Sequence, residues 1–212
     1  MLDSNSPNWL LERITDPETQ ELIEAKFRIE NISKQIQDCQ YEIIDSLCKE
    51  VGHPFMKAVE IGSWSGLSSC IIGSRLRIYD GTLYCIDNFL GGIEKASLVP
   101  VAEKYNIKDI FLSNVYWAEL DTTIKLLYMN SKEASKQFRN EELDFIFLDG
   151  DHSYDGVCLD CNLWYPKLKN KGIICGHDFY NDSGDGLTRA ILERWNGKFQ
   201  HKDQIWWVKK ED

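Results

Sequence analysis

Two aspartates and a histidine are the residues of this sequence best suited to catalysis. Asp149 follows an apolar run at 143–148, and Asp178 follows another at 172–175. Paired carboxylates suit a hard divalent cation and leave room for water and a diol. His152, which lies shortly after Asp149, is the best candidate for a general base because imidazole titrates near neutral pH. The alternatives are that both aspartates cap helices and bind a ligand's amine, and that His152 only forms local hydrogen bonds.

A glycine-containing turn predicts a binding loop earlier in the chain. Gly62 and Gly66 separate a β-prone run at 58–61, which includes Glu60, from a segment at 67–76 that reads as helix. Glycines at such a turn let backbone N–H groups approach a ligand closely. The Glu60 carboxylate repels phosphate but can accept hydrogen bonds from an ammonium or a ribose, which suits S-adenosylmethionine better than a pyrophosphate. The alternative is a turn whose glycines serve packing only.

The elements that must position these residues repeat at the spacing of parallel βαβ units. A run at 82–86 ends in Asp87, and an acid at a strand's carboxyl end can bind the two hydroxyls of a ribose. Another run, 124–128, precedes Asn130 and Ser131. Apolar strands whose polar residues gather at their carboxyl ends indicate an open α/β sheet with a crevice along that edge.

Five sequence blocks are together more specific than any one of these patterns. They are VEIGSWSG (59–66), YCIDNF (84–89), MNSKEASKQF (129–138), DFIFLDGDHSYDGV (144–157) and KGIICGHDF (171–179). Through them the chain resembles class I S-adenosylmethionine-dependent methyltransferases over roughly residues 55–210. More narrowly, it resembles the small-molecule O-methyltransferases of the macrocin O-methyltransferase and cephalosporin-hydroxylase-like group. The resemblance implies a doubly wound, Rossmann-like α/β domain at 55–212, with a seven-stranded sheet in the order 3-2-1-4-5-7-6, and a helical extension at 1–54.

The resemblance also implies which residues bind S-adenosylmethionine. Glu60 would receive the methionine ammonium, directly or through water, and Asp87 would bind the ribose hydroxyls. Asn130 and Ser131 would contact the adenine edge, and the glycine loop would lie against the carboxypropyl chain. For each residue the alternative is a turn or cap role. The full expected set is Glu60, Gly62, Ser63, Trp64, Gly66, Asp87, Asn88, Asn130, Ser131 and Asp149.

In metal-dependent relatives, the block that contains Asp149 and Asp178 holds Mg²⁺, with a second acid or amide beside the later aspartate. Here the neighbours of Asp178 are His177 and Phe179, so the third ligand is missing or replaced. Macrocin-type relatives carry a histidine at the place of His152, with a role as general base. The resemblance therefore implies catalysis by His152 and Asp149 and a possible Mg²⁺ site on Asp149 and Asp178. The residues able to replace the third ligand are Asp151, His177 and Asn181.

Composition limits the partners and the compartment. The formal net charge of −10 argues against nucleic acid as a substrate, because phosphate would be repelled. The longest apolar runs are too short to span a membrane, and no signal peptide is visible. An odd number of cysteines, seven, without an export signal predicts a reduced, cytoplasmic protein. The C-x-x-C pair at Cys158 and Cys161 has no second pair and is not expected to bind metal.

The N-terminal extension predicts a long helix that begins near Asp16 and ends at Gly52 and Pro54. Its apolar positions step by three and four residues, as in a coiled coil. This seam either packs on the chain's own sheet or cleft, or pairs with a second subunit as a homo-oligomer. The seam consists of Leu22, Ile29, Ile32, Ile36, Cys39, Ile43 and Leu47.

The connection that follows Asp87 is long and holds three aromatic residues, Phe89, Tyr116 and Trp117. Related enzymes close such segments over the acceptor, so these residues are either a lid or part of the core. The favoured function is methyl transfer from S-adenosylmethionine to a hydroxyl of a sugar or another polyhydroxylated small molecule. The alternatives are a metal-independent methyltransferase acting on another small nucleophile, and a non-catalytic S-adenosylmethionine-binding protein.

Overall fold

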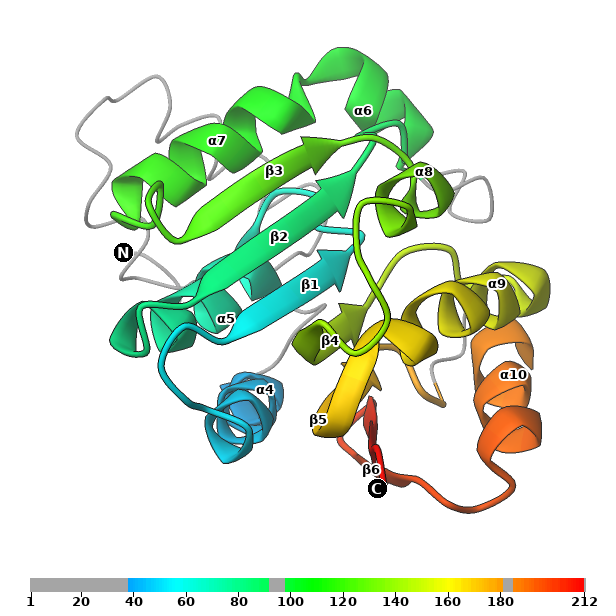
Figure 1. Ribbon diagram of the computed structural model, residues 1–212. Coiled ribbons are helices and arrows are strands. Elements are labelled where there is room, and N and C mark those ends of the chain that lie inside the picture. The colour runs from blue at the N-terminus through cyan, green and yellow to red at the C-terminus, as the bar shows by residue number, and fades with distance from the viewer. Residues whose placement is uncertain (1–37, 92–97, 181–184, 212) are drawn as a thin grey trace.

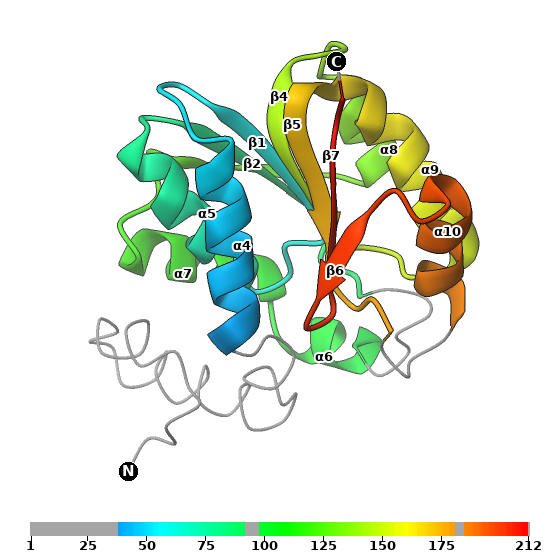
Figure 2. The ribbon, with the colours of Figure 1, turned by 90° about the horizontal axis from the view of Figure 1, so that it is seen from below.

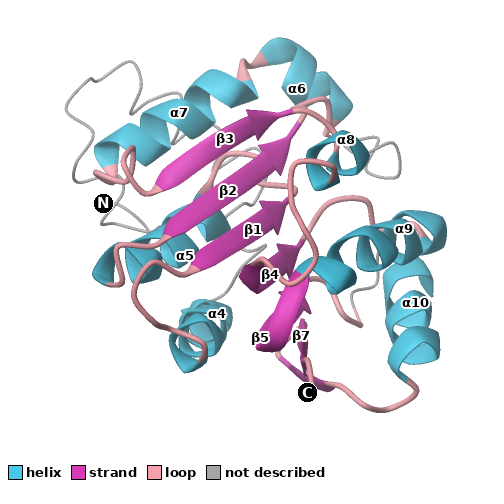
Figure 3. Cartoon of the chain, in the orientation of Figure 1, coloured by secondary structure: helices cyan, strands magenta, loops and turns pink. Residues whose placement is uncertain are grey.

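A seven-stranded sheet with helices on both faces forms the body of the protein (Figures 1 and 3). The computed structural model describes residues 38–91, 98–180 and 185–211. The strands are β1 (Lys57–Ile61), β2 (Thr82–Asp87), β3 (Ile124–Tyr128), β4 (Leu143–Leu148), β5 (Leu168–Gly176), β6 (Gln200–Lys202) and β7 (Ile205–Lys209). Their order in the sheet is β3-β2-β1-β4-β5-β7-β6, which confirms the predicted order.

The first five strands are parallel, and β7 runs antiparallel between β5 and β6. Because parallel strands share an orientation, the carboxyl ends of β1 to β5 meet at one edge of the sheet. β1 lies between β2 and β4 and pairs Ile61 with both Ile86 and Leu148, so the residues that follow these strands become neighbours. The sheet therefore collects the polar residues of the predicted site at one edge.

Two helical layers cover the sheet (Figure 2). One layer contains α4, α5 and α7, and its core includes Ile44, Cys70 and Phe111. The opposite layer contains α8, α9 and α10. The helices are α4 (Asp38–Glu50), α5 (Leu67–Ile78), α6 (Val99–Lys104), α7 (Ile107–Trp117), α8 (Ser131–Ser135), α9 (Tyr154–Trp164) and α10 (Asp185–Trp195), with a 3₁₀ turn η1 (Tyr165–Lys167).

Only part of the predicted N-terminal helix falls within the described residues. Of the predicted seam, Ile43 packs against the core beneath α4 and Leu47 is buried in it, so this end of the seam lies on the chain's own sheet. Cys39 is half-buried. The other positions, Leu22, Ile29, Ile32 and Ile36, and the predicted cap Asp16, lie outside the described residues. The homo-oligomer and the domain boundary at residues 54/55 therefore stay predictions. None of the helices described here is both long and apolar enough to cross a membrane.

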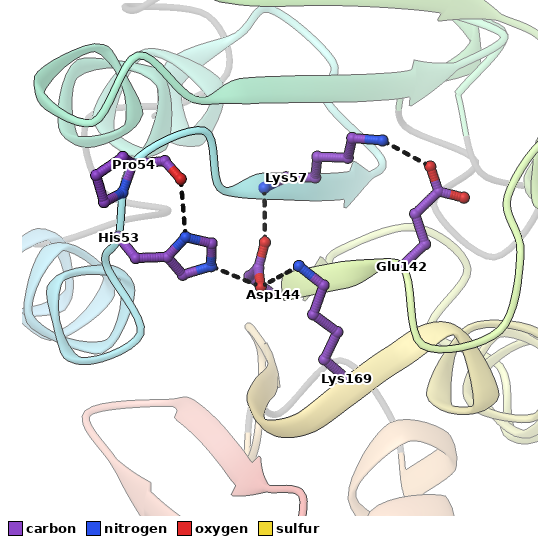
Figure 4. A network of polar contacts seen from close by, with 6 residues as sticks. All are labelled: His53, Pro54, Lys57, Glu142, Asp144 and Lys169. Atoms are coloured by element: carbon purple, nitrogen blue, oxygen red, sulfur yellow. Dashed lines mark hydrogen bonds and ion pairs between the residues drawn. The ribbon is translucent and has the colours of Figure 1, made fainter.

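A polar network joins three strands at the amino edge of the sheet, opposite the predicted site (Figure 4). Asp144 at the start of β4 is buried, and it accepts hydrogen bonds from the Lys57 backbone N–H at 2.8 Å and from Lys169 Nζ at 2.7 Å. His53 Nε2 lies 2.9 Å from the same carboxylate. Burial would raise the pKa of Asp144, but these hydrogen bonds outweigh it and lower the pKa below its ordinary value.

Replacing Asp144 with alanine should lower the free energy of unfolding by about 1–3 kcal/mol at pH 7, because the Lys57 N–H loses its acceptor. A carboxylate whose pKa is lowered by folding stabilises above its unfolded pKa and loses that contribution as pH falls through the folded value. Urea denaturation should therefore show the two proteins converging below about pH 4. Asp121→Ala, at an exposed site, should track the wild type. A constant difference between Asp144→Ala and wild type at all pH values would contradict this assignment.

Candidate active site

A pocket of about 480 Å³ opens at the carboxyl edge of the sheet, in the size range of small-molecule sites. Its walls come from the residues that follow β1, β2, β3 and β4, together with one side of α9. Seven of the residues expected to bind the cofactor line it: Gly62, Trp64, Asp87, Asn88, Asn130, Ser131 and Asp149. Three of the expected residues, Glu60, Ser63 and Gly66, are not on the pocket wall.

The turn after β1 requires glycine for two separate reasons. Gly62 has φ +87°, and a Cβ there would lie 2.2 Å from the backbone oxygen of Asp149. Gly66 caps α5 with φ +91°, and a Cβ there would lie 3.0 Å from the Phe111 ring. Both positions favour a residue without a side chain. The glycines therefore let the loop pack tightly against the end of β4 and the top of α7.

Asp87 holds this loop through both of its carboxylate oxygens. The Trp64 N–H donates to Oδ2 at 2.7 Å, and the Phe89 N–H donates to Oδ1 at 2.6 Å. Burial raises the pKa of Asp87, and the backbone hydrogen bonds oppose that shift. A carboxylate has about four lone-pair positions, so the fixed oxygens can still accept from two ribose hydroxyls. The position fits the predicted ribose contact.

Glu60 does not reach the pocket. Its side chain is fully buried between β1 and α5, where Ser69 Oγ donates to Oε2 and Cys85 Sγ lies 3.4 Å from the same oxygen. Burial raises the pKa of Glu60, and the hydroxyls of Ser68, Ser69 and Ser63 oppose the rise. In this arrangement Glu60 has no exposed surface from which to contact a ligand ammonium directly, and the expected contact, which included one through water, stays a prediction. Glu60 supports the loop from behind.

Asn130 and Ser131 begin α8 at the far wall of the pocket. The Asn130 side chain is exposed and accepts the Glu133 N–H at 2.9 Å as the helix cap. Ser131 Oγ donates to Asp160 Oδ1 and accepts from Trp164 Nε1 at 2.8 Å. Asp160 also lines the pocket, and the sequence prediction missed it. The sequence did contain an indication of its burial: Asp160 lies one helical turn from Val157 and Trp164, on the apolar face of α9.

His152 lies between the two predicted catalytic aspartates. Its Nε2 is 3.1 Å from Asp149 Oδ1, and its Nδ1 is 3.1 Å from Asp178 Oδ2. Ser153 caps α9 directly after it, accepting the Gly156 N–H at 3.1 Å. On the other side α10 packs closely, since a Cβ on Gly186 would lie 2.7 Å from the His152 backbone oxygen. Cap and helix together fix the imidazole between the carboxylates.

Asp149, His152 and Asp178 each offer one ligand atom within 4.8 Å of the others. Of the residues considered for a further ligand, His177 is the nearest among those described: its Nδ1 is 3.3 Å from Asp178 Oδ1 and 3.9 Å from Asp149 Oδ2. Asp151 is exposed and its Oδ1 accepts the Ser153 N–H, and Asn181 lies outside the described residues. Ligands around an octahedral cation at metal–oxygen distances near 2.1 Å are roughly 3 Å apart when adjacent and roughly 4 Å apart when opposite, so a spread of up to 4.8 Å would have to tighten slightly around a divalent cation.

A family model for a methyltransferase domain matches residues 59–179, which is more than half of the chain. The chain belongs to this methyltransferase family. The match begins at the glycine loop and ends just after Asp178, so it contains the pocket loops and both aspartates. Methyltransferases of this kind depend on S-adenosylmethionine.

Solved structures agree on the fold of this methyltransferase. A Klebsiella pneumoniae protein proposed to be an O-methyltransferase has a TM-score of 0.68 and 14% identity, covering 97% of this chain and 96% of that one. An O-methyltransferase from Bacillus cereus, solved in complex with SAH, has a TM-score of 0.62 and 16% identity over 93% and 92%. A protein of Acanthamoeba polyphaga mimivirus, called "Uncharacterized protein R132", is 26% identical over 158 residues. That alignment covers 74% of this chain and 66% of the relative's length.

The three aromatic residues considered as either a lid or part of the core, Phe89, Tyr116 and Trp117, do not lie over the pocket of the methyltransferase. Tyr116 and Trp117 end α7 on the approach to the start of β3, at the amino edge of the sheet and away from the pocket. Phe89 follows Asp87 at the correct edge but is buried against Phe111, with ring centroids 5.7 Å apart. The core alternative is therefore correct for Phe89, and α7 serves the fold.

Proposed function

We propose that this methyltransferase acts on a hydroxyl of a sugar or another polyhydroxylated small molecule, with a divalent cation bound at Asp149 and Asp178. The observation that carries the proposal is the placement of His152 between these two carboxylates at the pocket's edge. A base beside paired oxygen ligands suits an acceptor that carries neighbouring hydroxyls. A protein that only bound the cofactor would need the glycine loop and Asp87 but not this cluster.

The chain's residues supply positioning and proton transfer. S-adenosylmethionine, when bound, supplies an electrophilic methyl on its sulfonium. Asp87 and the Gly62 loop would hold its ribose and carboxypropyl ends, and His152 would remove the acceptor's proton as the methyl moves. Asp149 and Asp178 orient the imidazole, and a cation on them would lower the pKa of an acceptor hydroxyl. Of the residues named here, His177 is the best placed to complete the cation's ligands.

The acidic rim also limits the acceptor. Asp149 and Asp151 line the pocket, and Asp178 lies beside them. Together with the net charge of −10, these carboxylates would repel a phosphate-bearing substrate. A neutral polyhydroxylated acceptor is therefore favoured over nucleic acid.

Incubating the protein with S-adenosylmethionine, Mg²⁺ and a panel of sugars and polyols tests this assignment, and the formation of S-adenosylhomocysteine is the readout. Turnover only with amine or thiol acceptors would overturn the hydroxyl assignment.

Replacing Asp87 with alanine should weaken S-adenosylhomocysteine binding by about 1.5–3 kcal/mol, because two ribose hydroxyls lose a charged acceptor. Isothermal calorimetry on the full chain measures the loss directly. Asp121→Ala makes the same charge change at an exposed position and should bind like the wild type. If the wild type binds NAD more tightly than S-adenosylhomocysteine, the cofactor assignment fails.

A further inference from the structure

Asp160 is a buried acid that the proposed chemistry leaves unused. It lies on α9 with a 7% exposed surface, yet it lines the pocket. Its Oδ1 accepts the Ser131 hydroxyl, which in turn accepts Trp164 Nε1, so one carboxylate oxygen is fixed by the protein. Burial raises the pKa of Asp160 to about 6. A buried carboxylate lowers the free energy of unfolding unless hydrogen-bond donors pair its oxygens.

The second oxygen of Asp160 faces the pocket wall. Oδ2 lies 3.7 Å from the place where a Cβ on Gly150 would stand, and Gly150 itself lines the pocket. Among the described residues, no side chain or backbone group donates a hydrogen bond to Oδ2. A side chain at position 150 would narrow the space in front of this oxygen. The pocket therefore presents an acceptor on a side chain that is fixed through its other oxygen, and a donor on a bound ligand could pair it.

The surroundings of this acceptor indicate which part of the ligand reaches it. Asp160 is linked through Ser131 to the start of α8, whereas Asp87 and the glycine loop form the walls that follow β2 and β1. Leu159 and Met129 add apolar surface to the pocket. With the ribose held at Asp87, a flat heterocycle would lie on the side of α8 and α9. The exocyclic amine of adenine is the donor that S-adenosylmethionine carries at that end.

We propose that Asp160 Oδ2 accepts a hydrogen bond from the 6-amino group of the cofactor's adenine and makes the site selective for a 6-aminopurine. This inference rests on S-adenosylmethionine occupying the pocket. A 6-oxopurine would set its carbonyl oxygen against the carboxylate and be rejected, because two acceptors cannot pair. Rejection of a ligand that leaves a buried polar group unpaired is stronger than rejection by shape alone.

Calorimetry with two probes, S-adenosylhomocysteine and S-inosylhomocysteine, tests the proposal on the full chain. The wild type should prefer the adenosyl compound by roughly tenfold or more. Asp160→Asn should bring the two affinities within roughly threefold, because its amide can donate to a 6-oxo group and can still accept from Ser131. Asp155→Asn removes the same charge from an exposed site on the same helix and should keep the wild-type preference.

A purely structural role for Asp160 gives a different result. In that case Asp160→Asn would weaken both ligands equally and leave their ratio unchanged, which overturns the proposal. A wild type that binds both compounds equally overturns it as well, without any variant. The wild type should also lose at least about fivefold in affinity for the purine analogue that carries hydrogen in place of the 6-amino group, so a poorly folded Asp160 variant leaves the test intact. Failure of S-adenosylhomocysteine itself to bind would instead refute the cofactor assignment.

Discussion

Replacing His152 with alanine should lower kcat for methyl transfer by about 10²–10⁴-fold, the usual contribution of a positioned general base. Affinity for S-adenosylhomocysteine should change little, because His152 contacts Asp149 and Asp178 and is not among the residues that line the pocket. Steady-state kinetics with an acceptor from the sugar and polyol panel measures the first quantity, and calorimetry measures the second. A loss confined to kcat marks an interaction made in the transition state.

His53→Ala is the matched control for that experiment. His53 lies at the opposite edge of the sheet, where it contacts Asp144 and keeps 47% of its side chain exposed. Its removal should leave kcat within about twofold of the wild type, since a remote surface change seldom affects a site. In the pH–rate profile of the wild type, the rate should rise with pH as the general base loses its proton. This rise should be missing from the profile of His152→Ala. Full activity in His152→Ala would mean that proximity alone drives the reaction and that the proton leaves to water.

Most of the fold followed from the sequence because β1 to β4 are short, mainly apolar and followed by polar residues, whereas β6 is polar and exposed throughout. β4 is buried at all of its positions, and the acid after it could only lie at the sheet edge. The predicted ranges for β2, β3 and β4 agree with the structure to within one residue. β5 begins earlier than predicted, at Leu168, because a register shift near Leu143 and Phe145 accommodates a polar stretch that the apolar pattern did not indicate.

The site was harder to predict, because side-chain direction decides function and a motif does not specify it. Glu60 shares a face of β1 with Ala58, and successive strand residues point to opposite faces, so alternation placed it toward α5 and its serines. The long connection left Tyr116 as either a lid or a core residue, and the helix that carries it ends at the far edge of the sheet. Asp160 was missed because its burial depends on α9 packing against α8 and β4. Tertiary packing sets the distances between loops, so the spacing of motifs along the sequence does not give them.

Chelation of divalent metal should abolish turnover while leaving S-adenosylhomocysteine binding largely intact, because Asp87 and the Gly62 loop, and not the cation, would hold the ribose and carboxypropyl ends of that ligand. Mg²⁺ should restore activity, and Mn²⁺ should restore it at least as well if His177 contributes a nitrogen ligand. Asp178→Asn, which removes one charged ligand, should lower kcat by at least about tenfold even with Mg²⁺ present. Asp155→Asn, on the exposed start of α9, is its control for net charge.

The structure also contains the strongest argument against a metal, which makes this experiment decisive. Phe179 stands where metal-dependent relatives are expected to carry an oxygen ligand, and it is buried against Phe199, with ring centroids 5.3 Å apart. His152 already contacts both carboxylates, so the same cluster could work as a histidine held by two acids. Full turnover in excess EDTA would establish that second mechanism, in which Asp149 and Asp178 only orient the base. Loss of turnover that Mg²⁺ reverses would assign the two carboxylates to the cation, because an imidazole held by two acids alone needs no added ion to work.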